Sequence, residues 1–151
     1  MPAAVVKMYI PAKSAIVFKL LHDYDRRLEW DTLLRYASLT RGNTKAQKGA
    51  TSLCVGKSMF GIIRLETEYI TVKPDSLAAV KMINDPPFFS CFAASIRHKD
   101  QNNGSIATYN FQFHAKPSIL KYILEPIMLM YLKHETKKRL NALAHYFAHL
   151  E

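Results

Sequence analysis

The last third of the chain, residues 118–151, places apolar residues at the spacing of an α-helix. From residue 127 onward a mainly apolar stripe recurs every third or fourth position: Leu129, Leu132, Thr136, Leu140, Leu143, Phe147 and Leu150. Because a helix turns by about 100° per residue, these side chains share one face, and lysine, asparagine and histidine side chains form a polar back. We predict a long C-terminal helix against which the rest of the chain packs. Pro126 removes a backbone donor, so residues 119–125 are expected to form a separate or kinked turn.

Alternating apolar and polar residues predict strands over most of the remaining chain. The first spans residues 5–10, and two short helices follow it, at about 16–21 and 26–30. Six further strands are expected at residues 36–40, 51–55, 62–72, 78–82, 88–96 and 107–115. The alternation slips at Ile70, which indicates a β-bulge. The last strand has one apolar and one polar face, so we expect an antiparallel sheet that is covered on one side only.

The expected sheet is wider than the expected helix. Six or seven strands at about 4.8 Å each span roughly 30 Å, whereas a helix with its side chains is about 10–12 Å across. We therefore expect the sheet to curve around the helix and to leave a cavity between them. The predicted ligand-cavity residues are Trp30, Tyr69, Phe88, Phe92, Tyr109, Phe111, Phe113, Met128, Tyr131 and Leu132. Any single aromatic residue on a strand is more often part of an ordinary core than of a ligand site, and it is the group as a whole that indicates a cavity.

Two segments near the ends of the chain carry a recognisable pattern. Residues 9–34 read YIPAKSAIVFKLLHDYDRRLEWDTLL: a strand ends in Ile-Pro, and a helix, an Asp-aromatic-Asp turn and a tryptophan follow. Residues 116–147 read KPSILKYILEPIMLMYLKHETKKRLNALAHYF. Both segments resemble the START-like (Bet v 1-like, SRPBCC) superfamily, in particular its polyketide cyclase/dehydrase and lipid transport branch. The resemblance implies an α+β helix-grip fold: a curved antiparallel sheet of six to seven strands around a long C-terminal helix, with a hydrophobic cavity between them. It does not imply one activity, because the superfamily includes cyclases, hydratases, lipid and quinone carriers and hormone receptors.

Length and composition are those of one globular unit. The 151 residues, 49% of them hydrophobic, predict a single START-like domain over residues 1–151. Cys54 and Cys91 lie far apart in apolar, strand-like runs, and two cysteines in a chain of this length are not a disulfide framework, so we expect two reduced thiols. The longest apolar stretch, residues 119–132, contains charged residues and a proline and is too short for a membrane span. No signal peptide is recognisable at the N-terminus, and a cytoplasmic location is expected.

The net charge of the chain is strongly positive. It amounts to +9, from 21 Lys and Arg residues against 12 Asp and Glu residues. Such an excess attracts phosphates, anionic lipids or acidic partners. The basic residues are spread along the chain, and no nucleic-acid-binding motif accompanies them, so no nucleic acid is expected as a partner. A peripheral contact with an anionic membrane fits the charge.

Few side chains carry a catalytic or metal-binding signature. His145 and His149 lie four residues apart, but they fall on the polar back of the helix and lack the glutamate of the zinc-protease motif, so no metal site is predicted. Glu135 and Tyr109 are the catalytic candidates, as a general acid or base and a hydrogen-bond donor. An ion pair of Glu135 with a nearby Lys or Arg is the favoured alternative to a catalytic role. The sequence has no phosphate-binding loop, nucleophile elbow or dinucleotide fingerprint, and no cofactor is expected.

Three functions remain open on these grounds. The first is binding or transport of a hydrophobic small molecule, such as a lipid, a quinone or a polyketide-like aromatic, in the cavity between sheet and helix. The second is a polyketide cyclase/dehydratase-type enzyme that uses polar cavity residues. The third is an interaction module with a filled core that binds a protein through its basic helix. The volume of the cavity and the polar atoms that reach it would separate these functions.

Overall fold

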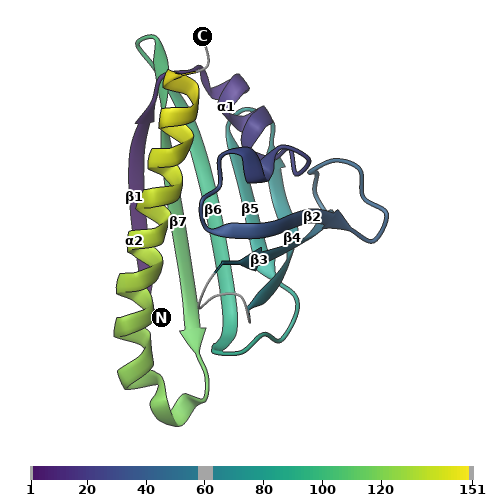
Figure 1. The fold of residues 1–151 in the computed structure, drawn as a ribbon. Coiled ribbons are helices and arrows are strands. Elements are labelled where there is room, and N and C mark those ends of the chain that lie inside the picture. Colours follow the sequence, from purple (N-terminus) through teal and green to yellow (C-terminus); the bar gives the residue numbers. More distant parts are fainter. Residues whose placement is uncertain (1, 58–62, 150–151) are drawn as a thin grey trace.

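One antiparallel sheet organises the structure, a computed structural model that describes residues 2–57 and 63–149. Its seven strands follow the order β1–β7–β6–β5–β4–β3–β2 (Figure 1). The strands are β1 (Ala3–Ile10), β2 (Leu34–Thr40), β3 (Thr51–Gly56), β4 (Arg64–Lys73), β5 (Leu77–Met82), β6 (Phe89–Gln101) and β7 (Gly104–Ala115). The helical elements are α1 (Ser14–Leu21), η1 (Arg27–Glu29), η3 (Ser118–Leu120) and α2 (Lys121–Ala148). Of the sequence predictions, the start of the third middle strand at Ile62 and the stripe position Leu150 fall outside the described residues.

The sheet curves strongly, as its sequence indicated. In Figure 1, β2 and β3 run across the direction of β6 and β7. The pairing of β4 with β5 shifts between Tyr69 and Thr71, which confirms the predicted bulge. A bulge bends its strand and increases the local twist. The predicted fold, a curved antiparallel sheet with a long C-terminal helix, is therefore confirmed.

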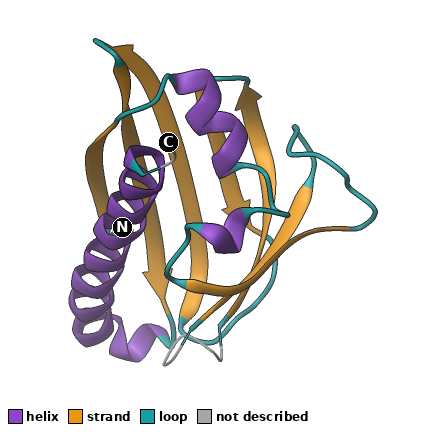
Figure 2. Ribbon diagram, turned by 45° about the horizontal axis from the view of Figure 1, so that its top comes forward, coloured by secondary structure: helices purple, strands orange, loops and turns teal. Residues whose placement is uncertain are grey.

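The long helix α2 lies along one edge of the sheet rather than over its middle. It packs against β1 and β7, and α1 and η1 cover the opposite part of the same face (Figures 1 and 2). Its buried residues Thr136, Leu140 and Leu143 belong to the predicted stripe. Its first half is only partly covered: Met128, Leu129 and Leu132 pack against the core, whereas Tyr122 and Met130 are exposed.

The separate turn expected over residues 119–125, before Pro126, is shorter than predicted. The structure places the irregular turn at η3, and α2 then continues through Pro126. Because Pro126 is only the sixth residue of α2, its missing N–H removes one bond near the helix start and leaves the later turns intact. The second predicted helix after β1 is also smaller than expected, a single 3-10 turn.

Two clusters of buried side chains fill the space between the sheet and the helices. One includes Trp30, Tyr69 and Leu143 and extends under α1 and the C-terminal half of α2. The other includes Phe89, Phe111 and Phe113 and packs against the earlier turns of α2. The pocket described below lies where these two clusters meet.

Candidate ligand pocket

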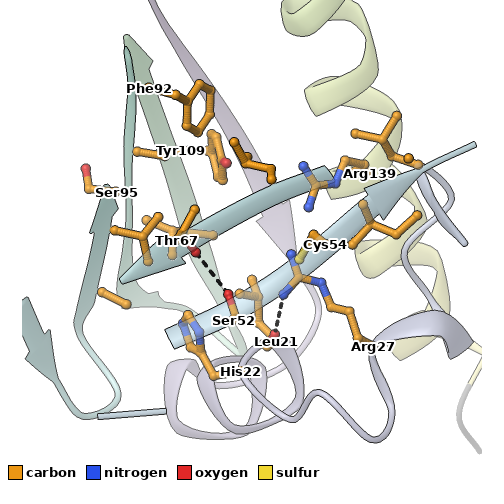
Figure 3. A pocket seen from close by; sticks show the side chains of 18 of the residues that line it. Leu21, His22, Arg27, Ser52, Cys54, Thr67, Phe92, Ser95, Tyr109 and Arg139 are labelled. Carbon is orange, nitrogen blue, oxygen red and sulfur yellow. Dashed lines mark hydrogen bonds between the residues drawn. The ribbon is translucent and has the colours of Figure 1, made fainter. Parts of the chain in front are cut away.

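A pocket of about 160 Å³ lies on the concave side of the sheet. Its apolar wall comes from β4, β5, β6, the segment before β4 and α2 (Figure 3), and it includes Ile63, Leu65, Val80, Phe89, Phe92 and Leu132. The inward alternation of β4 places Leu65, Thr67 and Tyr69 on this side. Its polar end comes from the end of α1, from η1, and from β3 and α2. The pocket thus joins an apolar wall to a small set of polar groups, as ligand sites usually do.

Two arginines at the polar end share one carboxylate. Arg27 donates from Nε to Asp31 Oδ2 at 2.9 Å, and Arg139 donates from Nη2 to the same oxygen at 2.8 Å. Arg139 Nε is also 3.0 Å from Asp31 Oδ1. Asp31 is 2% exposed, and its side chain lies behind the two arginines, which line the pocket. The ion cluster joins η1 to the middle of α2.

All three groups of this cluster are charged at neutral pH. Burial acts to lower the pKa of Arg27 and of Arg139, but the Asp31 carboxylate outweighs it and raises both pKa values above the usual range. Burial acts to raise the pKa of Asp31, but Arg139 and Arg27 outweigh it and lower this pKa to about 2. Two positive charges and one negative charge give the cluster a net charge of +1.

A hydrogen-bonded chain of three side chains lines another part of the pocket. The Tyr69 hydroxyl is 2.8 Å from His22 Nδ1 and 2.9 Å from the Tyr24 hydroxyl. Burial, followed by Arg27 and His98, lowers the pKa of His22 to about 3, so the imidazole is neutral. Burial and the neighbouring Tyr24 raise the pKa of Tyr69. The buried Nε2 of His22 has no hydrogen-bond partner among the described residues.

Smaller polar groups from the strands complete the lining. Ser52 on β3 and Thr67 on β4 bond to each other across the strands at 2.9 Å. Cys54 also lines the pocket, as a free thiol whose pKa burial raises. Cys91 is free as well, in agreement with the two reduced thiols expected from the sequence.

The structure separates the ten predicted cavity residues into two groups. Tyr69, Phe92, Tyr109 and Leu132 line the pocket. Phe111 and Phe113 lie in the core cluster with Phe89, and Met128 packs against that cluster. Phe89 lines the pocket, whereas Phe111, Phe113 and Met128 do not reach it, because α2 lies over β1 and β7 and covers that end of the inward row.

The remaining predicted residues also lie away from the pocket lining. Trp30 is buried under the Arg27 guanidinium, whose central carbon is 5.2 Å from the ring centroid. Phe88 is 43% exposed. Tyr131 interacts with Glu135 on α2. Of the two catalytic candidates, Tyr109 lines the pocket, whereas Glu135 lies 3.6 Å from Lys138 in the ion pair considered as its alternative role.

The sequence analysis missed Arg27, Asp31, Arg139 and His22. The signal for Arg139 lies in the helical stripe, since residue 139 follows Thr136 by three and precedes Leu143 by four, which puts a charge on the buried face. Arg27 and Asp31 are four residues apart, a spacing that brings side chains together across one helical turn. A charge on a predicted core face indicates a buried ion pair or a site.

Metal binding and membrane spanning find no support in the described part of the chain. Residues 2–57 and 63–149 contain no group of three or more His, Cys, Asp or Glu side chains that could hold a metal ion. His145 and His149 are both exposed, as predicted for the polar back of the helix. No helix within those ranges has the length and apolar character needed to cross a bilayer.

Comparisons with known proteins identify a family and several solved structures of the same fold. The family described as polyketide cyclase / dehydrase and lipid transport matches residues 1–148. Among curated proteins there is no match. A START superfamily protein from Mycobacterium smegmatis has a similar structure, with a TM-score of 0.81 at 9% identity, and the match covers 99% of each chain.

Two further solved structures have the same fold. The protein XoxI from Bacillus cereus gives a TM-score of 0.79 at 14% identity, over 99% of this chain and 98% of that one. The di-domain ARO/CYC protein BexL gives a TM-score of 0.75 at 9% identity, and the match covers 96% of this chain and 46% of that one. At such low identities the similarity shows the fold alone.

Proposed function

Because the chain belongs to the polyketide cyclase/dehydrase and lipid transport family, we propose that it binds or transports a hydrophobic small molecule in the pocket between the sheet and α2. The supporting observation is the lining itself, an apolar wall with a few buried polar groups at one end. The volume of about 160 Å³ favours a compact guest of one or two rings over an extended diacyl lipid. An apolar cavity of about 150 Å³ is known to hold a benzene-sized guest.

The proposal is tested by filling the pocket. Ala94 lines it on β6, and Ala94→Leu would place three additional carbon atoms there. Ala93 is the matched control, because it is the neighbouring residue on the same strand and is not part of the lining. In native mass spectrometry against a panel of one- and two-ring aromatics, neutral and acidic, we expect 1:1 complexes for the wild type and Ala93→Leu, and their loss in Ala94→Leu. Absence of any complex, or equal binding by Ala94→Leu, would contradict the proposal.

A second candidate is a cyclase/dehydratase-type enzyme. The hydrogen-bonded Tyr24–Tyr69–His22 chain favours it, since hydroxyl and imidazole groups that line the pocket can donate hydrogen bonds to a substrate carbonyl. Catalytic roles for Tyr109 and Glu135 stay predictions. Incubation with a short linear poly-β-ketone thioester separates the two candidates: an enzyme would form a product lighter by one water faster than buffer does, and His22→Phe would abolish this. A carrier would release the thioester unchanged.

We further propose that the protein meets an anionic membrane through η3 and the start of α2. Ile119 and Tyr122 are 84% and 82% exposed, and Ile123 and Met130 are exposed beside them, with Lys121 among them. Exposed apolar side chains next to lysines suit the boundary between lipid headgroups and acyl chains.

Co-sedimentation with vesicles tests this contact. We expect the wild type to bind vesicles that contain phosphatidylserine more than vesicles of phosphatidylcholine alone, and Tyr122→Ser to weaken the binding. Val5→Ser, an exposed apolar position on β1, should behave as the wild type. Equal binding to both vesicle types, or no effect of Tyr122→Ser, would contradict the contact.

A further inference from the structure

We propose that the ligand of the pocket carries a deprotonated carboxyl group, which Arg139 and Arg27 hold at the polar end. The proposal rests on the proposed function in one respect, that the pocket is a ligand site. It adds the charge of the ligand, its orientation, and the two side chains that select it.

The first argument is the charge balance of the pocket. Its described lining contains two arginines and no aspartate or glutamate. Asp31, behind the lining, is the carboxylate that bonds to both arginines, so one positive charge is left without a counter-charge. The other titratable groups of the lining do not supply one, because burial keeps Cys54 and Tyr69 protonated. A buried charge without a partner is costly, and a bound monoanion would balance it.

The second argument is the use of hydrogen-bonding atoms. Both oxygens of Asp31 are occupied: Oδ2 accepts from Arg27 and Arg139, and Oδ1 accepts from Arg139 Nε and from the Leu33 backbone N–H at 3.1 Å. Arg27 Nη1 donates to the Leu21 carbonyl at 3.3 Å. Arg27 Nη2 and Arg139 Nη1 donate to no acceptor among the described residues. In Figure 3 both guanidinium groups lie beside Cys54, at the edge of the pocket.

These remaining donors define the class of ligand. Guanidinium N–H groups recognise the two oxygens of a carboxylate well, and such charge-assisted bonds are stronger than neutral ones. A carboxylate carries one negative charge, which matches the surplus of +1, whereas a phosphate monoester would exceed it. The apolar wall around Phe92 and Leu132 then takes the rest of the molecule. The ligand class is therefore a small aromatic or short aliphatic monocarboxylic acid.

The test compares an acid with its neutral counterpart of nearly the same shape. 2-Naphthoate and 2-naphthamide are titrated into the wild-type protein at neutral pH by isothermal titration calorimetry. We expect the acid to bind about ten- to a hundredfold more tightly than the amide, the factor that corresponds to hydrogen bonds with a charged partner. In Arg139→Met the preference should vanish, since the Arg27–Asp31 pair that remains is neutral. Arg97→Met is the matched control, because Arg97 is exposed on β6, and it should keep the preference.

The outcomes distinguish this proposal from the proposed function. Equal affinity of the wild type for acid and amide, or an unchanged preference in Arg139→Met, would overturn the carboxylate proposal while the pocket remains a ligand site. Binding of neither compound would overturn the carboxylate proposal, and it would overturn the proposed function as well only if the native mass spectrometry panel also gives no complex. If circular dichroism shows that Arg139→Met does not fold, Arg139→Lys keeps the charge but loses the forked geometry and should bind the acid several-fold more weakly. The comparison within the wild type decides the question independently of any variant.

Discussion

Replacing Asp31 by asparagine should destabilise the fold more than any other single change in the ion cluster. The side chain is 2% exposed, and its carboxylate is the shared acceptor of Arg27 and Arg139. Asp31→Asn keeps the size and removes the charge, so the net charge of the cluster rises from +1 to +2. Removing one partner of a buried ion pair typically costs about 3–5 kcal/mol. Since a domain has about 5–15 kcal/mol of stability in total, we expect a loss that is readily measured.

The charge balance also predicts an order among the variants. Arg139→Met lowers the net charge to zero and leaves Arg27 paired with Asp31, so its cost should be smaller, about 1–3 kcal/mol. Asp85→Asn is the control for the chemical change: Asp85 pairs with Lys116 at the surface, where its side chain is 89% exposed. An exposed pair contributes less than about 1 kcal/mol.

Urea unfolding at neutral pH measures these differences. The single tryptophan, Trp30, is buried beside Arg27 and reports the site by its fluorescence, while circular dichroism reports the whole fold. If Asp31→Asn lowers the free energy of unfolding no more than Asp85→Asn does, the cluster does not hold a buried charge network. If Arg139→Met lowers the free energy of unfolding more than Asp31→Asn does, the assignment of a surplus positive charge is wrong.

Three further predictions concern the frame around the pocket. His98 is buried without a described hydrogen-bond partner, and burial lowers its pKa to about 4, so the unfolded chain binds a proton more readily below the usual pKa of 6.5. Stability is therefore lost as the pH falls between these two values, and His98 contributes about 2 kcal/mol of this loss from pH 7 to pH 5. His22, whose pKa is about 3, contributes a similar loss, so urea unfolding of His98→Phe should show a pH dependence that is smaller than that of the wild type but not absent; an identical pH dependence would count against the prediction. Leu143→Ala should cost about 2–5 kcal/mol in urea unfolding, because Leu143 is fully buried and anchors α2, and a cost near zero would mean that the helix does not need this contact. Gly104→Ala should lower the melting temperature, because its Cβ would overlap the Ile10 carbonyl across the β1–β7 pair, and an unchanged value would refute that close approach.

The parts of the fold that follow from local periodicity could be predicted from the sequence. Alternation located the strands, the slip at Ile70 located the bulge between Tyr69 and Thr71, and the stripe through Thr136, Leu140 and Leu143 located the buried face of α2. These features depend on neighbouring residues in the chain, and each is set by the repeat of one element.

The pocket lining was harder to predict because it depends on where α2 lies across the sheet. Tyr109, Phe111 and Phe113 alternate identically on β7, yet only Tyr109 lines the pocket, because the helix covers the other two. Periodicity gives the face on which a side chain lies but not the element that packs over it.

The ion cluster depends on contacts that span most of the chain. Asp31 and Arg139 are separated by 108 residues, so no local pattern pairs them. What the sequence did contain was the charge itself at a buried helical position. Arg139 lies three residues after Thr136 and four before Leu143, so it falls on the predicted buried face of the helix, where a charged residue is unusual.

The most direct test of the ligand pocket is an NMR titration of the ¹⁵N-labelled protein with 2-naphthoate. A bound guest changes the surroundings of the backbone amides around it. We predict saturable shifts at Cys54, Thr67 and Ala94, which line the pocket from three different strands, and little change at the exposed His145. The absence of shifts, or shifts confined to the exposed start of α2 near Tyr122, would contradict the account.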